Sequence, residues 1–228
     1  ARSKTGKSKF LRFEGHYLGW LDNVCYGIST PSPEALGPRN APSPNAWSQG
    51  LPPDSINEFH LLPWNDLELV KAKLEESHHE IAAIITEPIM CNNGCIVPNE
   101  GYLKGLRALC DEYNVALIFD EVITGFRIGL GGAQTYFGIT PDMSIFAKAI
   151  GSGYPISAIV GKKEWMEEIS SARVIHAGTM NTANPTVAAA MATVSVLERE
   201  NPYAKMFDLG DQLRNGLRDL AKKTGHNM

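Results

Sequence analysis

Two ionisable residues, Asp120 and Lys148, stand at the ends of short apolar runs that are typical of buried strands. Lysine is rarely buried without a partner, and a desolvated pocket lowers the pKa of a lysine enough to make its amine a nucleophile. Pyridoxal phosphate requires both groups, because a lysine forms a Schiff base with its aldehyde and an acid pairs with its pyridinium nitrogen. The pair therefore favours pyridoxal-phosphate chemistry.

Each of the two residues also has a simpler interpretation. Lys148 alone fits an amine that extends to the surface from a strand end, and Asp120 alone fits a carboxylate that caps the next turn. Side chains alternate along a strand, so Asp120 and Val122 should share one side while Glu121 takes the other. In that arrangement the carboxylate could hold a ring N–H while Val122 packs on the ring face.

The elements that must position this pair alternate between strands and helices. Residues 29–57 hold most of the prolines and predict a long irregular segment, and residues 125–138 predict a glycine-rich loop. The alternation predicts an α/β fold whose mostly parallel sheet is covered by helices on both faces, with ligands beyond the carboxyl ends of the strands. The pattern indicates strands over 80–88, 115–122, 143–148 and 154–161, and helices over 65–77, 98–114, 163–170, 184–200 and 202–223.

The composition excludes several classes of protein. The chain has 228 residues, a net charge of −4 and 43% hydrophobic residues, which suits a soluble globular protein. Lys and Arg are spread along the chain, which argues against a nucleic-acid partner, and no apolar run reaches membrane-spanning length. The four cysteines form no CxxC pair. We therefore predict a cytoplasmic protein that binds neither nucleic acid nor membrane.

The remaining motifs give weaker signals. His78 and His79 are adjacent and cannot share a metal as an i, i+4 pair could, and Cys91 and Cys95 form a CxxxC without a second pair, so no metal site is predicted. Glu87, before a proline, is interpreted first as a structural acid at a strand end and, after that, as an acid that supports the residues of the site. The segment "ARSKTGKS" at 1–8 resembles a loose phosphate-binding loop, which leaves nucleotide binding as an alternative; such a loop needs a strand before it and a helix after it.

Four segments, taken in order, resemble the class III (ω-type) pyridoxal-phosphate aminotransferases. They are "FDEVITGFR", "GGAQTYFGITPD", "FAKAIGSGYPISAIVG" and "HAGTMNTANP". The spacing from Asp120 to Lys148 also matches the family pattern. The segment "FEGHYLG" at 13–19 is similar to the "FEGxYHG" of the glutamate-1-semialdehyde 2,1-aminomutase branch. The resemblance implies a fold-type I large domain and an enzyme that transfers amino groups with pyridoxal 5′-phosphate.

Carried over to this chain, the resemblance implies a role for each matching residue. Lys148 would bind the cofactor aldehyde and act as general base and acid in the proton shift. Asp120 would pair with the pyridinium nitrogen, Val122 would press on one face of the ring, and Tyr17 would stack on the other. Thr179 would bind the cofactor phosphate of a partner subunit, because sites in this family lie between the two chains of a homodimer.

Two residues bear on the reaction that the resemblance implies. Asn92 falls where the aminomutase branch has an Asn near the 3′-oxygen of the cofactor, and Ile123 replaces a Gln that is common in ω-aminotransferases. Both favour an aminomutase-like transfer within one small amino aldehyde or acid. The alternative is an ω-aminotransferase that passes the amine to a separate keto acid or aldehyde.

The chain also departs from the family pattern. Leu18 stands where the branch usually has His, and Cys91 replaces a usual Gly. The chain starts without Met and stops soon after a helix, so we expect an internal fragment. Residues 1–200 would form the cofactor-binding large domain, incomplete on its N-terminal side, and 201–228 the start of a truncated small domain. Such a fragment could bind the cofactor poorly.

Overall fold

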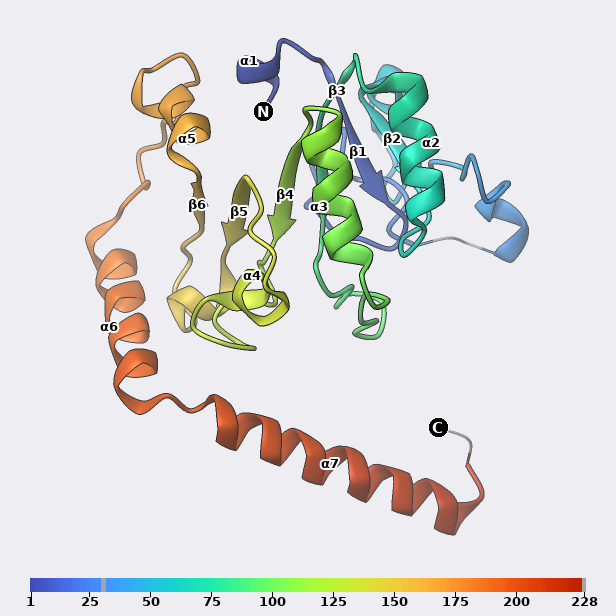
Figure 1. Cartoon of the computed structure of the whole chain (residues 1–228). Coiled ribbons are helices and arrows are strands. Elements are labelled where there is room, and N and C mark those ends of the chain that lie inside the picture. Colours follow the sequence, from blue (N-terminus) through green and yellow to red (C-terminus); the bar gives the residue numbers. More distant parts are fainter. Residues whose placement is uncertain (30–31, 227–228) are drawn as a thin grey trace.

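The computed structural model describes residues 1–29 and 32–226, which form a mixed sheet with helices (Figure 1). The strands lie in the order β2-β1-β3-β4-β5-β6, and every neighbouring pair is parallel except β5 and β6. This confirms the predicted α/β fold with a mostly parallel sheet. The strands are β1 (Lys9–Phe13), β2 (Phe59–Leu62), β3 (Ile81–Thr86), β4 (Ala116–Asp120), β5 (Met143–Phe146) and β6 (Ala158–Gly161).

The helices lie on the two faces and at one edge of the sheet. Helices α2 and α3 cover one face, whereas α1 contacts β3 and α5, and α6 and α7 extend away from the sheet (Figure 1). Within residues 1–29 and 32–226, the loops contain three 3-10 helices: η1 (Pro33–Leu36), η2 (Pro53–Glu58) and η3 (Lys148–Gly151). The α-helices are α1 (Arg2–Thr5), α2 (Leu67–Ser77), α3 (Tyr102–Glu112), α4 (Gly132–Phe137), α5 (Lys163–Ser170), α6 (Asn184–Glu200) and α7 (Tyr203–Thr224).

The main core lies between the sheet and the pair α2 and α3. Alternate residues of β1, Leu11 and Phe13, point into it, as the strand period requires. Leu103 and Leu106 of α3 meet them from a helix face with apolar residues three to four positions apart. Each such buried side chain contributes about 1.5–3 kcal/mol, so this core holds β1, β3 and β4 in place.

Helix α4 forms within the segment that the sequence predicts as a glycine-rich loop. Its cap is Glu121, which is fully buried and accepts the backbone N–H groups of Ala133 and Gln134 in the first turn of α4. A carboxylate at a helix N-terminus satisfies unpaired N–H groups and the helix dipole. The prediction missed α4 because its cap comes from the end of β4 and not from the residue before the helix.

Residues 1–8 do not form a phosphate-binding loop. They contain α1 and a turn, after which Gly6, Lys7 and Ser8 lead directly into β1. A phosphate-binding loop of this type needs a helix after it, because the first N–H groups of that helix point at the phosphates. The nucleotide-binding alternative is therefore wrong.

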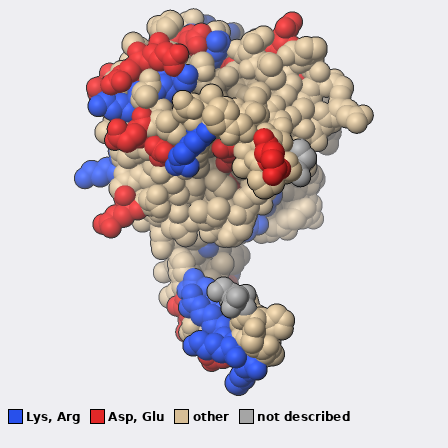
Figure 2. Space-filling model, turned by 90° about the vertical axis from the view of Figure 1, so that its right-hand side faces the viewer, with Lys and Arg blue, Asp and Glu red and all other residues tan. Residues whose placement is uncertain are grey.

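Helix α7 projects from the body of the molecule, and Figure 2 shows Lys and Arg side chains gathered on the projecting part. Its apolar residues recur at helical spacing but stay exposed: Met206, Leu209, Leu213, Leu217 and Leu220. The aromatic ring of Phe207 stacks on Tyr136 of α4, with the ring centroids 6.2 Å apart. None of the helices described is both long enough and apolar enough to cross a membrane.

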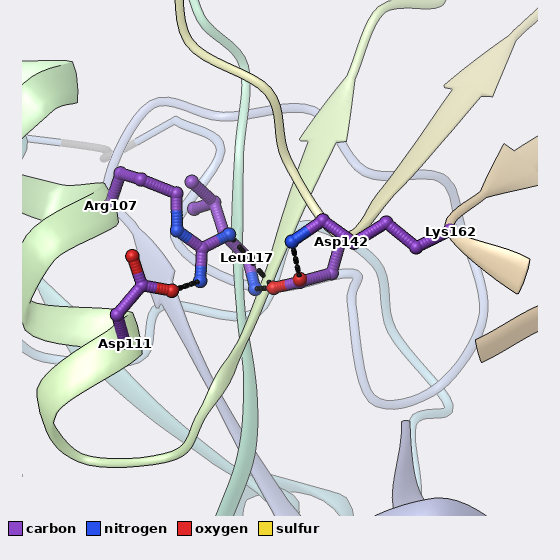
Figure 3. Close-up of polar contacts among 5 residues, drawn as sticks. All are labelled: Arg107, Asp111, Leu117, Asp142 and Lys162. Atoms are coloured by element: carbon purple, nitrogen blue, oxygen red, sulfur yellow. Dashed lines mark hydrogen bonds and ion pairs between the residues drawn. The ribbon is translucent and has the colours of Figure 1, made fainter. Parts of the chain in front are cut away.

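Asp142, just before β5, links the amino ends of β4 and β5 to the carboxyl end of β6, which runs antiparallel to β5 (Figure 3). Its Oδ1 accepts from Nζ of Lys162 at 2.7 Å, and its Oδ2 accepts from Arg107 and from the backbone N–H of Leu117, each at 2.8 Å. Burial alone would raise the pKa of Asp142, but these hydrogen bonds and charges together lower it. Asp142 therefore fixes β4 and β5, the strands that lead to Asp120 and Lys148, against β6.

Asp142→Ala is expected to destabilise the chain by about 3–5 kcal/mol, because it leaves the Arg107 cation and the Leu117 N–H without their buried partner. Because the folded pKa lies below the ordinary 3.8, the contribution of Asp142 is present above that pH and is lost as the pH falls through the folded pKa. Urea unfolding at pH 7 and pH 3 measures both effects. A variant as stable as the wild type at pH 7 would contradict this role.

Candidate active site

A pocket of about 180 Å³ lies beyond the carboxyl ends of β3, β4 and β5. Ligands of parallel sheets bind in this position. The pocket brings together five residues that the sequence predicts for one site: Tyr17, Asn92, Asp120, Val122 and Lys148.

Asp120 is the buried acid of this pocket. Its side chain ends β4, and its Oδ1 accepts the backbone N–H of Val122 at 3.1 Å. Burial raises the pKa of Asp120 to about 6; the Val122 hydrogen bond opposes this shift, the charge of Glu87 adds to it, and the charge of Lys148 opposes it. The carboxylate is therefore mostly ionised at pH 7 and is electrostatically coupled to Lys148 across the pocket.

The alternation predicted for this strand end is confirmed. Asp120 and Val122 both line the pocket, whereas Glu121 turns away from it and accepts from the hydroxyl of Thr124 at 3.1 Å. Thus two adjacent acids have separate tasks, because the strand geometry sends one to the pocket and the other to the cap of α4.

Lys148 lies at the mouth of the pocket and is exposed. It is the first residue of η3 and has a positive φ of 47°, which is uncommon for a residue with a side chain. In this chain Lys148 is exposed, although the sequence favours a desolvated lysine, because the backbone leaves β5 and enters η3 at this residue. Strained backbone of this kind occurs often at functional sites. Among the described residues, Lys148 has no acid within ion-pair distance.

Glu87 organises the pocket, a role that the sequence analysis ranks below a purely structural one. Its Oε1 accepts from the backbone N–H of Tyr17 at 2.8 Å and from the side-chain amide of Asn92 at 3.1 Å, and its Oε2 accepts from the N–H of Cys91 at 2.9 Å. The carboxylate thus joins two segments that lie far apart in the sequence. The only signal was an acid directly after an apolar strand, which a structural role explains equally well.

Two aromatic residues support Tyr17 and Glu87. His16 is fully buried, and its Nδ1 accepts the backbone N–H of Glu87 at 3.2 Å. Burial, together with the charge of Arg12, lowers the pKa of His16 to about 3, so the ring is neutral. The ring of Trp47, from the irregular segment 29–57, meets the ring of Tyr17 edge-on at 5.7 Å. That segment therefore helps to position the site.

Thr179 stands apart from the other predicted residues. It is exposed, in the turn before α6, and it does not line the pocket. Its predicted contact is with the cofactor of a partner subunit, so this contact stays a prediction. Leu18 and Ile123 do line the pocket, where both add apolar surface.

The residues present fit a flat heteroaromatic cofactor with an aldehyde. Of the two carboxylate oxygens of Asp120, Oδ1 accepts a hydrogen bond from the described residues and Oδ2 does not. Oδ2 is therefore available to a ring N–H. Val122 and Ile145 offer apolar walls, and Lys148 supplies an amine at the mouth. This set of groups is the one that pyridoxal phosphate requires.

Comparisons with known proteins agree with this fit. The family model described as Aminotransferase class-III matches residues 1–227. Glutamate-1-semialdehyde 2,1-aminomutase from Methanococcus maripaludis is 43% identical over 98% of this chain and 50% of its own length, and the protein of that name from Methanocaldococcus jannaschii is 42% identical over 100% and 51%. The chain thus spans about half the length of the curated relatives it matches.

Solved structures show the same fold. An ω-transaminase from Sphaerobacter thermophilus superposes with a TM-score of 0.86 at 31% identity, over 98% of this chain and 51% of that one. A glutamate-1-semialdehyde aminomutase from Pseudomonas aeruginosa superposes with a TM-score of 0.81 at 28% identity, over 97% of this chain and 49% of that one. The match extends along nearly all of the chain, including the segments that line the pocket.

Proposed function

This chain belongs to the class-III aminotransferase family, and on that basis we propose that its pocket binds pyridoxal phosphate and that the complete protein is an amino-group-transferring enzyme of the aminomutase type. It would move the amino group within one small amino aldehyde or acid, as the names of its relatives suggest. The observation that carries the proposal is the meeting of Asp120 and Lys148, from the ends of adjacent parallel strands, in one pocket.

When bound, pyridoxal phosphate supplies an aldehyde that reacts with amines and a ring that accepts electrons when a substrate Cα–H bond breaks. Asp120 would accept the ring N–H and keep that nitrogen protonated, since its carboxylate is mostly ionised at pH 7. Val122 and Tyr17 would hold the ring from its two faces. Glu87 keeps Tyr17 and Asn92 in place through the hydrogen bonds to its Oε1.

Lys148 would have two tasks. Its Nζ would bind the cofactor aldehyde until a substrate amine displaces it, and the freed amine would then take the proton from the substrate Cα and return it at the carbon that is to be protonated. Its position at the pocket mouth supports both tasks, because a long side chain anchored at the rim can reach into the pocket and withdraw from it.

The direct test is borohydride reduction of the complete protein after incubation with pyridoxal phosphate, followed by peptide mass mapping. We expect a stable pyridoxyl group on Lys148, which also blocks tryptic cleavage after that residue. An unmodified Lys148 in protein shown to be folded would overturn the proposal and return this lysine to the role of a surface amine.

Asn92 and Ile123, both in the pocket, favour the aminomutase over the ω-aminotransferase alternative. We expect the complete enzyme to isomerise its amino aldehyde or acid substrate without any added keto acid or aldehyde acceptor. Product formation followed by chromatography, with and without an added keto acid, measures this. A strict requirement for the acceptor would favour the ω-aminotransferase.

The assembly and the location belong to the same proposal. The complete protein would be a cytoplasmic homodimer with shared active sites, in which Thr179 binds the cofactor phosphate of the partner. Its exposed place outside the pocket is compatible with a contact to a second chain. Residues 1–200 would belong to the large domain and 201–228 would begin a second one; the exposed apolar stripe of α7 supports that division.

A further inference from the structure

Cys91 and Cys95 flank a tight turn at the rim of the pocket. Met90 and Ile96 pair in antiparallel fashion and exchange both backbone hydrogen bonds, at 3.0 and 3.1 Å. The Cα atoms of such a pair lie about 5.5 Å apart. Cys91 follows Met90 and Cys95 precedes Ile96, so both lie inside the turn that this pair closes. Positive φ angles at Gly94 and Cys95 reverse the direction of the chain within the turn. The turn therefore brings Cys91 and Cys95 back toward each other, and the Cys95 sulfur lies 3.9 Å from the Cys91 carbonyl oxygen; a disulfide requires Cα atoms about 4.4–6.8 Å apart.

The two thiols are already neighbours and differ in access. The Cys95 sulfur is 3.9 Å from the carbonyl oxygen of Cys91 and is exposed, whereas Cys91 is half-buried. Burial, and next the neighbouring Cys95, raise the pKa of Cys91 to about 12. Cys95 is therefore the thiol that reacts first with a molecule from solution. The other two cysteines, Cys25 and Cys110, are buried.

We propose that Cys91 and Cys95 are a redox modification site, which forms a reversible disulfide by exchange with a small-molecule disulfide such as oxidised glutathione. The Cys95 thiolate attacks one sulfur of the oxidant and releases the first glutathione thiol. The Cys91 sulfur then attacks the Cys95 sulfur and releases the second. Two protein thiols are oxidised, one oxidant disulfide is reduced to two thiols, and the two protons pass from the protein to the glutathione.

The bond would act on the pocket through the residue next to Cys91. Asn92 lies within the loop that the disulfide closes, and Glu87 accepts both from the Cys91 N–H and from the Asn92 amide. Linking the two sulfurs constrains the turn that carries Asn92. The site itself follows from the geometry alone, whereas its importance for catalysis depends on the proposed function. A loop this short gains little from closure, so the bond should be easily reduced.

The test is exchange with oxidised glutathione on the native chain, followed by alkylation of the remaining thiols and tryptic mass mapping. Lys73 and Lys104 bound a tryptic peptide, residues 74–104, that contains Cys91 and Cys95 and no other cysteine. We expect this peptide to lose the mass of two hydrogen atoms and to recover it after treatment with dithiothreitol. Cys25 and Cys110 should be alkylated only after unfolding, which shows that the chain was folded.

Single variants show how each cysteine reacts with glutathione when the other is absent. Cys91→Ser should leave a glutathione adduct on Cys95, and Cys95→Ser should leave Cys91 almost unreacted under the same conditions. Recovery of both thiols alkylated in the wild type, or of separate glutathione adducts without the internal bond, would overturn the proposal. None of these readouts requires pyridoxal phosphate, so a failure here is distinct from a failure of the proposed function.

Discussion

Lys148→Ala in the complete protein is expected to lower amino-group transfer by about 10⁴-fold or more, because one substitution removes both the covalent anchor and the proton-transfer group. The fold should survive. Lys148 is exposed, and its side chain makes no hydrogen bond or ion pair with the described residues, so its removal leaves neither a cavity nor an unpaired charge. The measurements are kcat, circular dichroism, and borohydride labelling of the variant.

Lys163→Ala provides the matched control, because Lys163 is an exposed lysine on α5, outside the pocket. It should keep wild-type turnover and the label on Lys148. Near-normal turnover by Lys148→Ala would exclude Lys148 as the catalytic amine, even if the cofactor still bound. Loss of the fold in Lys148→Ala would instead show that the turn at η3 depends on this side chain.

Asp120→Asn is expected to lower turnover on the order of 10²- to 10³-fold, the loss typical of removing one pre-organised charged partner from a reacting centre. Asn is nearly isosteric and can still accept the Val122 N–H, but it carries no charge to keep the ring nitrogen protonated. Steady-state kinetics and the absorbance spectrum of the bound cofactor measure the effect. Asp219→Asn, at an exposed position of α7, is the control and should change neither.

The same variant should be more stable than the wild type at pH 7 in the cofactor-free state. Burial raises the pKa of Asp120 from 3.8 to about 6. At a pH between these two values, the folded chain therefore binds more protons than the unfolded chain. Stability therefore falls as the pH rises through this window, and Asn removes that loss. Thermal unfolding at pH 4 and pH 7 measures this. Unchanged stability at pH 7 would show that Asp120 is not strained by burial.

Lower turnover together with higher stability in Asp120→Asn distinguishes a functional acid from a structural one. A structural acid, such as Asp142, is held by cations and N–H groups that lower its pKa, so its removal destabilises the chain. Asp120 is buried at a cost to stability, which is reasonable only if a bound partner offsets it. A destabilised Asp120→Asn chain with full activity would reverse this assignment.

By itself, the sequence predicts the pair Asp120 and Lys148, the mostly parallel sheet and the helices α2, α3, α5, α6 and α7. These follow from local periodicity and from residue types at strand ends, which a few neighbouring positions determine. The resemblance to the family adds Tyr17, Val122 and Asn92, and the pocket contains all three.

Only the tertiary structure decides how the site is held. The hydrogen bond from Tyr17 to Glu87 joins residues 70 positions apart, and the bond from Ala133 to Glu121 forms α4 from a cap outside the helix. The exposure of Lys148 likewise depends on the turn after β5 and on the neighbours of the pocket mouth. Such contacts depend on the path of the whole chain, because partners distant in sequence meet only when the strands are in register.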